Sequence, residues 1–394
     1  AQEAYDVIVV GAGNAAFSAA VSARQKGARV LVLEAAPEDE AGGNSRYTAG
    51  AIRFAFDGVD DVRAVCPDIT DEEAKNTDFG SYSEDQYFDD MFRVTQYRAD
   101  PDLVEVLVRN SFDTMKWLSE TGIRFQPSYG RQAFKLPDGR FQFWGGLSLE
   151  AWGGGPGLVD TWFKLAEKLG IDVWYQARGL ELLFDGFAVK GVKVRRPNEI
   201  IDVASRAVVL AAGGFQSSPE MRTRYLGPGW DIAKVRGTRY NTGGGIEMAL
   251  KVGAATAGNW SGCHAVGWDM NAPEFGDLAV GDNFQKHSYP FGIMVNANGE
   301  RFVDEGADFR NYTYAKYGAV ILNQPGSFAW QVFDQKVLHL LRDEYRIKQM
   351  TKVVGNTLEE LAERMDGVNK EAFLKEMKAY NPAVRTDIPF GLSL

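Results

Sequence analysis

The hydrophobic pattern at the start of the chain predicts a strand, a helix and a second strand. Residues 5–10 (YDVIVV) form a short β-branched run, which is typical of a strand buried on both faces of a parallel sheet. Alanine-rich sequence continues from there to Lys26 and stops at Gly27, where a helix commonly ends. A second apolar run at 29–33 predicts the next strand, and Glu34 follows it directly.

The turn between the first strand and the helix carries the pattern GxGxx(G/A) at Gly11, Gly13 and Ala16. Gly11 permits a tight turn, Gly13 lets the backbone approach a pyrophosphate, and Ala16 lets the helix pack closely on the strand. The start of the helix offers N–H groups and the positive end of its dipole to phosphates. Glu34, about 20 residues further on, can accept a hydrogen bond from a ribose 2′-hydroxyl, which favours FAD or NAD(H) over NADP(H). The pattern therefore predicts a dinucleotide site.

Two amphipathic helices are predicted further along the chain. Ser83 is expected to cap the first, and Pro101 to begin the second, which would end near Gly122. Apolar residues at helical spacing usually face a core, so we assign no chemistry to them. In the second helix these residues are Leu103, Val106, Leu107, Phe112 and Trp117. The polar segment 57–79 is expected to be irregular.

The next part of the chain predicts a loop, a helix and three strands. The glycine-rich stretch 144–157 is typical of a loop, and it leads into a helix at 158–169 and a strand at 173–175. Apolar runs at 179–184 and 189–194 predict an antiparallel hairpin.

Composition narrows the class of protein. The 394 residues are 45% hydrophobic and 24% charged, which is typical of a soluble globular protein of about two domains. The formal net charge of −10 argues against nucleic-acid binding, and no apolar run reaches the ~20 residues that span a bilayer. Cys66 and Cys263 are too few for a disulfide framework or a zinc site, so we expect no metal and a reducing, cytoplasmic location.

Three further motifs follow the nucleotide turn. Residues 41–50 (AGGNSRYTAG) place two glycines and small polar residues after Glu34. Residues 207–215 (AVVLAAGGF) predict a strand that ends in a glycine pair, and residues 241–246 (NTGGGI) predict a turn. In this order, the four motifs resemble the flavoprotein subunit of the fumarate reductase and succinate dehydrogenase superfamily. Segments such as 263–275 (CHAVGWDMNAPEF) resemble more closely the FAD-dependent tricarballylate dehydrogenase group.

The resemblance implies an α/β fold in which a Rossmann-like (GR2-type) FAD-binding domain carries an inserted α+β capping domain. The FAD-binding domain is expected at 1–257, with a helical insertion at about 57–150. The capping or substrate domain is expected at 258–380. Residues 381–394 are expected to begin the return to the FAD-binding domain, with its remainder missing.

The resemblance also implies FAD as the cofactor. Relatives that bind flavin covalently use a histidine in the loop after the nucleotide fold. Residues 41–50 contain none, so FAD is expected to be non-covalent. The residues expected to contact FAD lie on the nucleotide turn, at Glu34, on the glycine loop at 41–50, at the start of the strand at 179–184, and on the two later glycine motifs. They are Gly11, Gly13, Asn14, Ala15, Ala16, Glu34, Ala35, Gly42, Gly43, Asn44, Ser45, Thr48, Ala49, Gly50, Arg178, Gly179, Ala211, Ala212, Gly213, Asn241, Thr242, Gly243 and Gly244.

For the substrate, the resemblance implies cations that bind carboxylates and a group that moves one proton. His264 occupies the family position of a carboxylate-binding histidine, and Arg310 aligns with the proton-donating arginine of fumarate reductases. Gln285 and Ser288 stand where those reductases carry the Glu and Arg of a proton relay, which leaves the proton route open. The catalytic candidates are Arg310, His264, Tyr312 and His287, with Tyr314 as a further proton carrier and Arg46 and Arg53 as weaker carboxylate contacts.

The resemblance implies an FAD-dependent dehydrogenase that acts on CH–CH groups. We expect it to desaturate a small polycarboxylate, as in tricarballylate to cis-aconitate, by hydride transfer to flavin N5. A fumarate-type reductase and a 3-ketosteroid dehydrogenase are alternatives within this class. An alternative of another class is a flavin-binding module that is inactive without a redox partner. The expected partners are a small-molecule carboxylate and an electron-acceptor protein, without nucleic acid or a membrane span.

Overall fold

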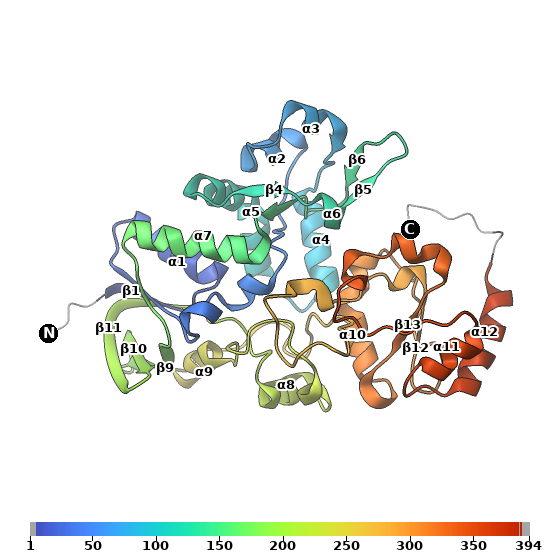
Figure 1. Cartoon of the computed structure of the whole chain (residues 1–394). Helices are drawn as coiled ribbons and strands as arrows, with labels where there is room; N and C mark the ends of the chain where they lie inside the picture. Colours follow the sequence, from blue (N-terminus) through green and yellow to red (C-terminus); the bar gives the residue numbers. More distant parts are fainter. Residues whose placement is uncertain (1–4, 386, 388–394) are drawn as a thin grey trace. The chain divides into compact units, whose positions relative to one another are not determined.

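The computed structural model describes residues 5–385 and residue 387, and it divides the chain into two units (Figure 1). The first unit runs to Met221 and includes Gly237–Trp260, and the second consists of Arg222–Arg236 and the chain from Ser261 onward. Residues 222–236 thus lie in the second unit and not in the first domain, where the sequence predicts them. Residues 381–383, expected in a return segment, continue the last helix of the second unit. The predicted segment 388–394 lies outside the described residues.

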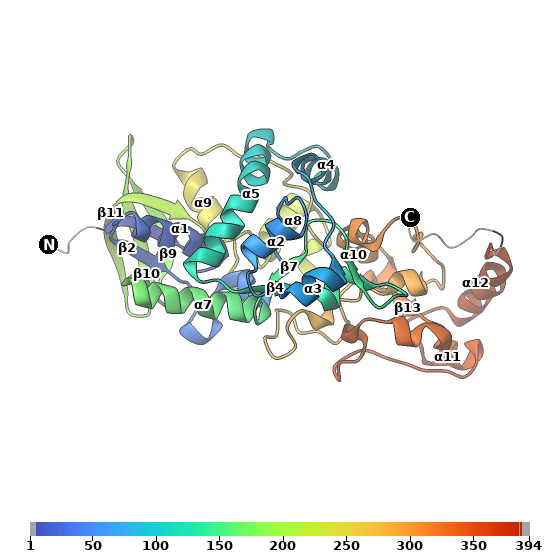
Figure 2. The same cartoon turned by 90° about the horizontal axis from the view of Figure 1, so that it is seen from above.

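A six-stranded sheet forms the centre of the first unit, in the order β8-β2-β1-β11-β10-β9. The first four strands are parallel, and β9 and β10 form the antiparallel hairpin that the sequence predicts. The strands are β1 (Tyr5–Val10), β2 (Val30–Leu33), β8 (Asp172–Trp174), β9 (Arg178–Phe184), β10 (Val189–Arg196) and β11 (Glu199–Leu210). This arrangement confirms the predicted α/β fold. In both views the strands lie together beside α1 (Figure 1, Figure 2).

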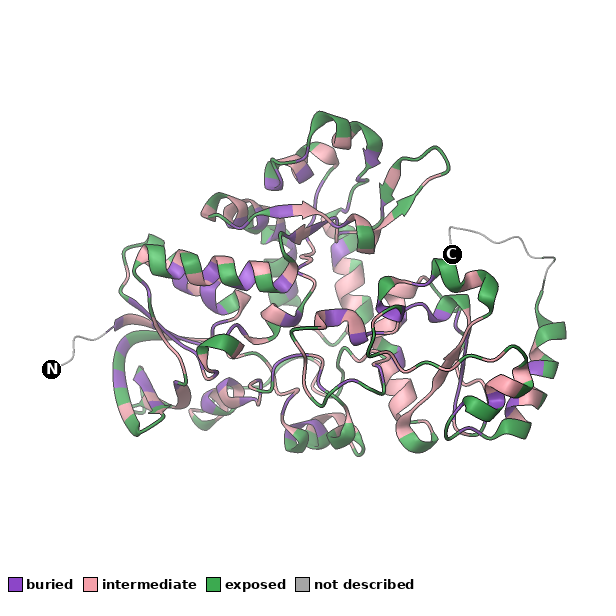
Figure 3. Ribbon diagram, viewed as in Figure 1, coloured by how far each residue is buried: buried purple, intermediate pink, exposed green. Residues whose placement is uncertain are grey.

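Both faces of the parallel strands are buried. Val9 and Val32 belong to one hydrophobic core, while the neighbouring Ile8 and Leu31 belong to another on the opposite face, because side chains alternate along a strand. Helices α1 (Asn14–Gln25) and α7 (Gly154–Leu169) pack together on the first core. Along α7, buried and exposed residues alternate in the helical pattern (Figure 3). Helix α9 (Gly244–Lys251) contacts β9 and supplies Met248 to the second core.

The segment predicted to be irregular contains short elements instead. They are α2 (Val59–Val65), α3 (Asp71–Asn76) and β3 (Thr77–Asp78). A capping box stabilises α3, since Thr70 accepts the Glu73 N–H at 3.1 Å and the Glu73 carboxylate accepts the Thr70 N–H at 3.0 Å. Elements this short depend on such local bonds, so hydrophobic periodicity did not predict them.

The glycine-rich stretch before α7 is more ordered than predicted. It contains β7 (Leu149–Ala151), and α7 begins at Gly154 rather than at residue 158. A side chain on Gly155 would place Cβ 2.4 Å from the Ser45 carbonyl oxygen. The glycines therefore let the first turn of α7 pack against the backbone of the 41–50 loop.

Helices α4 (Glu84–Val94) and α5 (Pro101–Thr121) begin where the sequence predicts. Ser83 caps α4 by accepting the Gln86 N–H at 3.2 Å. The predicted core face of α5 was wrong in part, however, because Leu103, Val106 and Leu107 are exposed, whereas Phe112 and Trp117 are partly buried and pack against the first core. The buried residues of this helix are Val104, Val108, Ser111, Met115 and Leu118. Both stripes have helical spacing, and the Ser111 hydroxyl, which accepts the Ala55 N–H at 3.0 Å, lies on the stripe that faces the core.

The second unit contains a two-stranded antiparallel sheet of β12 (Ile293–Val295) and β13 (Trp330–Val332) with helices around it. Helices α11 (Leu358–Arg364) and α12 (Lys370–Ala383) share a core with these strands, in which Phe373 is fully buried. The remaining elements of the two units are β4 (Phe125–Pro127), α6 (Tyr129–Gln132), β5 (Ala133–Lys135), β6 (Phe141–Phe143), α8 (Pro219–Leu226) and α10 (Tyr314–Leu322). Within residues 5–385 and 387, no helix combines the length and apolar character needed to span a bilayer.

Two leucines of α5 test which face of this helix packs. Leu118 is 3% exposed and Leu103 is 67% exposed. We expect Leu118→Ala to lower the free energy of unfolding by about 2–5 kcal/mol, because it leaves a cavity in the core. The matched control Leu103→Ala should change it by less than about 0.5 kcal/mol. Denaturant titration followed by circular dichroism measures both, and equal effects would contradict the assignment.

Candidate functional site

A cavity in the first unit lies at the carboxyl ends of β1, β2 and β11, where ligands bind in open α/β sheets. Most residues predicted to contact the cofactor line it. They are Gly11, Gly13, Asn14, Ala15, Glu34, Ala35, Gly43, Asn44, Ser45, Arg178, Gly179, Ala211, Ala212, Gly213, Asn241, Thr242 and Gly244. Sequence motifs hundreds of residues apart thus meet around one space.

The nucleotide turn brings the start of α1 to this cavity. Gly11 has φ +113°, and a side chain there would place Cβ 2.3 Å from the Ala211 carbonyl oxygen. Gly13 precedes α1 and has no side chain to cap the helix, so the helix N-terminus remains available to an anion. The Asn14 N–H donates to the Ser45 hydroxyl at 2.9 Å, which fixes the glycine loop beside the turn. These residues can hold a pyrophosphate.

Glu34 lies buried in the cavity wall. Its carboxylate accepts the N–H groups of Ala36 at 2.9 Å and of Gly42 at 3.3 Å. Burial raises the pKa of Glu34, and the bonds from these N–H groups oppose that rise. A carboxylate has about four acceptor sites, so two such bonds leave capacity for the hydroxyls of a ribose.

Asn44 joins the glycine loop to a later segment of the same unit. Its side-chain oxygen accepts the Thr238 N–H at 3.0 Å. Any side chain at Gly237 would place Cβ 2.0 Å from that oxygen. Across the cavity, the Arg178 guanidinium donates to the Thr242 hydroxyl at 3.2 Å.

Some predicted cofactor contacts lie outside the cavity lining, namely Ala16, Gly42, Thr48, Ala49, Gly50 and Gly243. Packing accounts for their positions. Gly50 has φ +83° and passes the backbone of Gly154 so closely that a Cβ would lie 2.9 Å away, while Ala16 is fully buried in the core. The lining also contains residues that the prediction missed, namely Val10, Ala12, Leu33, Ala177, Tyr240 and Gly245. Val10 and Leu33 are the last residues of β1 and β2. Their position at the strand ends could have predicted that they line the cavity.

A second candidate site lies in the second unit around Tyr314, the first residue of α10. His264 Nε2 lies 3.2 Å from the Tyr314 hydroxyl, and the His287 ring lies 4.5 Å from the Tyr314 ring between centroids. The Arg310 guanidinium carbon lies 6.0 Å from the same ring centroid. The structure thus brings together three of the predicted catalytic residues. The ring of Tyr312, the fourth, packs edge-on against Phe309 at 6.4 Å.

Arg310 is a partly buried cation. Within the part of the chain that the structure describes, it has no carboxylate partner, and its contact is the Tyr314 ring. Burial, and then the nearby charge of Arg342, lower the pKa of Arg310 to about 10, so it remains charged at neutral pH. A charged, partly buried guanidinium without a carboxylate partner attracts an anion, and its planar shape matches that of a carboxylate.

His287 lies beside this cation and is 4% exposed. Its Nε2 has no hydrogen-bond partner among the described residues. Burial, followed by the charges of Arg310, Arg236 and Arg342, lowers the pKa of His287 to about 2. Desolvation by the surrounding protein atoms, and then the charge of Arg236, also lower the pKa of His264. The residue is nevertheless exposed to solvent. Both imidazoles are therefore neutral at pH 7, and each can donate or accept a hydrogen bond.

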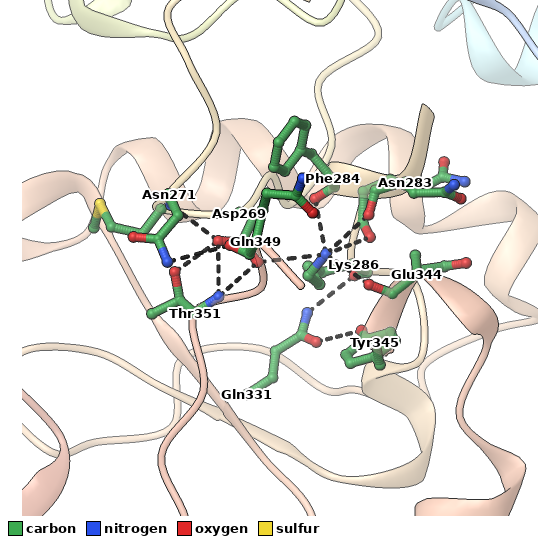
Figure 4. A network of polar contacts seen from close by, with 12 residues as sticks. Asp269, Asn271, Asn283, Phe284, Lys286, Gln331, Glu344, Tyr345, Gln349 and Thr351 are labelled. Atoms are coloured by element: carbon green, nitrogen blue, oxygen red, sulfur yellow. Dashed lines mark hydrogen bonds and ion pairs between the residues drawn. The ribbon is translucent and has the colours of Figure 1, made fainter. Parts of the chain in front are cut away.

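A polar network centred on Lys286 holds the segment before His287 (Figure 4). The Lys286 ammonium donates to the carbonyl oxygens of Asn283, Phe284 and Gln285 at 3.2 Å and of Glu344 at 3.1 Å. It also lies 3.4 Å from the Asp269 carboxylate, which in turn accepts the Thr351 hydroxyl at 2.6 Å. Burial lowers the pKa of Lys286, and the Asp269 charge opposes this.

The same network fixes the residue after His287. The Ser288 N–H donates to the Tyr345 hydroxyl at 2.9 Å, and the Ser288 hydroxyl accepts the Arg342 N–H at 3.1 Å. Gln285, which the resemblance also places at a relay position, accepts a bond from Arg236 at 3.4 Å. Each of the two residues thus bonds to an arginine that has a carboxylate partner, Arg236 with Asp282 at 2.6 Å and Arg342 with Glu344 at 3.2 Å.

The other arginine candidates have carboxylate partners. Arg46 pairs with Asp160 at 2.9 Å, and Arg53 lies 3.6 Å from Asp90. Among the described residues, no cluster of three or more His, Cys, Asp or Glu side chains is arranged to hold a metal ion.

The sheet order, the glycine turn and the cavity define a dinucleotide-binding α/β protein. The sequence profile of the FAD binding domain family matches residues 6–390, and the chain belongs to that family. Its fold is that of the fumarate reductase flavoproteins. A solved structure of the open conformation of a flavocytochrome c3 fumarate reductase superimposes with a TM-score of 0.71 and 26% identity, covering 97% of this chain and 62% of that one.

Two curated relatives have similar identity. A probable fumarate reductase, Ifc3, of Shewanella frigidimarina is 28% identical over 99% of this chain and 61% of its own length. A vinyl phenol reductase of Lactiplantibacillus plantarum is 28% identical over 87% of this chain and 64% of its own length. The chain thus spans about three fifths of the length of these two relatives.

The depressed pKa of His287 predicts how stability depends on pH. In the unfolded chain the His287 imidazole binds a proton near pH 6.5, whereas in the folded chain it binds one only near pH 2. Stability from this group is therefore complete above pH 6.5 and decreases as the pH falls toward 2, with a loss of about 2 kcal/mol between pH 7 and pH 5. His287→Gln should remove that part of the slope in denaturant titrations at both pH values. The exposed His339 supplies the matched control, and an unchanged slope in His287→Gln would contradict the prediction.

Proposed function

We propose that the protein is an FAD-dependent oxidoreductase that interconverts a C–C single and double bond in a small carboxylate. The observation that carries the substrate class is Arg310, a partly buried cation with no carboxylate partner among the described residues, beside two neutral histidines. The family and the cavity in the first unit support FAD as the cofactor.

Each group of residues has a separate task in this proposal. The turn at Gly11 and Gly13, with the start of α1, holds the pyrophosphate, and Glu34 accepts the ribose hydroxyls. Bound FAD supplies the hydride acceptor or donor. Arg310 binds a substrate carboxylate, and the buried Nε2 of His287, which has no hydrogen-bond partner among the described residues, offers a further hydrogen bond.

Two reactions remain as candidates. We propose desaturation of a polycarboxylate, as in tricarballylate to cis-aconitate, because Arg310 can bind one carboxylate and the two neutral histidines beside it can hydrogen-bond a second. The fumarate reductase name of a relative of 28% identity favours the reverse direction, reduction of fumarate. A ketosteroid or a vinyl phenol leaves Arg310 without an anion, so this cation disfavours both.

A redox experiment on the purified protein tests this function. Under anaerobic conditions, tricarballylate or succinate should bleach the oxidised flavin, or fumarate or cis-aconitate should reoxidise the reduced flavin. A vinyl phenol and a ketosteroid serve as uncharged controls. Acid precipitation should release the flavin into the supernatant, because we propose that it is non-covalent. The proposal fails if the protein takes up no FAD, or if only the uncharged compounds react.

Replacing Arg310 tests whether FAD and the substrate are bound by separate groups of residues. Arg310→Ala should retain FAD, whose proposed ligands lie in the first unit, and lower kcat/KM for the acid by about 100-fold or more. Arg346, an exposed arginine paired with Asp343 at 2.8 Å, is the matched control, and Arg346→Ala should leave both properties unchanged. Turnover by Arg310→Ala at the wild-type rate would exclude Arg310 from the site.

A further inference from the structure

We propose that Tyr314 exchanges the proton with the substrate carbon, and that His264 reloads Tyr314 from solvent. This assignment rests on the proposed function, and it gives Arg310 the task of binding the carboxylate. The two residues form a short path from water to the anion site.

The position of Tyr314 supports the first half of the path. Its hydroxyl is 3.2 Å from His264 Nε2, and its ring contacts both His287 and Arg310. An anion bound to Arg310 therefore lies close to the phenol of Tyr314. Tyrosine is one of the side chains that act as general acids in enzymes.

The contrast between the two histidines supports the second half. The His264 side chain is exposed, so its ring exchanges protons with water. His287 is 4% exposed, and the charges of three arginines oppose a second proton on its ring. His287 therefore positions groups in the site, while His264 connects the site to solvent.

The resemblance to fumarate reductases places a proton relay at Gln285 and Ser288, whose side chains have no group that titrates near pH 7. They bond instead to Arg236 and to the Arg342 backbone. These two residues therefore cannot return a proton to Arg310.

In the reductive direction, bound FAD would supply the hydride that one alkene carbon receives, and the neighbouring carbon takes the proton from the Tyr314 O–H bond, which leaves a phenolate. The Nε2–H of His264 then returns a proton to that oxygen while Nδ1 takes one from water. His264 ends neutral as the other tautomer, and water supplies the net proton. Desaturation follows the same path in reverse.

Two variants test the path. Tyr314→Phe keeps the ring, so succinate binding measured by calorimetry should stay within about threefold of wild type, while kcat should fall about 100-fold or more. His264→Ala should lower kcat about tenfold or more, and added imidazole should restore much of it, because the site of the lost ring is exposed. His339→Ala, which removes an exposed histidine outside the cluster, should change neither value.

A spectroscopic readout does not depend on turnover. In nitrogen-15 NMR of the imidazoles, Tyr314→Phe should shift the His264 signals and leave those of His339 in place. An unshifted His264 would overturn the path. So would Tyr314→Phe with more than a tenth of the wild-type kcat, His264→Ala without imidazole rescue, or a loss that occurs in Tyr312→Phe instead.

The two proposals fail in different ways. If the wild type turns over an acid and Tyr314→Phe does so equally well, the proton path is wrong and the carboxylate oxidoreductase stands. If the FAD-loaded wild type reacts with none of the acids, the proposed function is wrong, and the proton path is rejected with it.

Discussion

The cavity of the first unit depends on the close approach of three strand ends. The Gly11 N–H donates to the Leu33 carbonyl at 2.7 Å, and the Ala211 N–H donates to the Val10 carbonyl at 2.9 Å. Only a residue without Cβ fits at Gly11, where φ is +113° and the Ala211 oxygen lies in the way. Because these bonds hold β1, β2 and β11 in register to their last residues, the strands stop together and the cavity opens above them. A larger residue at Gly11 would disturb the sheet and the cavity at once.

The second unit builds its site on charge rather than on close backbone contact. Arg310 and His287 occupy a region where burial disfavours charge, and the Lys286 network holds the neighbouring backbone in place. That network satisfies a buried ammonium with four carbonyl oxygens and Asp269, as a buried charge requires. The contrast is informative, since Lys286 is fully partnered while Arg310, in the same unit, has no carboxylate partner within the described chain. The partners thus distinguish Lys286, a structural cation, from Arg310, the cation that we propose to bind the substrate anion.

Sequence reasoning succeeded where local rules decide the structure. The strand, glycine turn and helix at 5–25 follow from residue size and backbone freedom, so their boundaries and their place at the cavity could be predicted. The buried face of α5 could not, because two apolar stripes had the same period and only tertiary packing chooses between them. Tyr312 and Tyr314 are two residues apart in similar sequence, and only the turn of chain before α10 brings Tyr314 to His264. The Lys286 network joins residues as distant as Asp269 and Thr351, which no short pattern encodes.

The proposed role of Arg310 also bears on the choice of buffer. A partly buried guanidinium without a carboxylate partner among the described residues attracts small anions of any kind. An anion that binds only the folded chain stabilises it by mass action. We therefore expect citrate, sulfate or phosphate both to protect the fold and to compete with the proposed substrate.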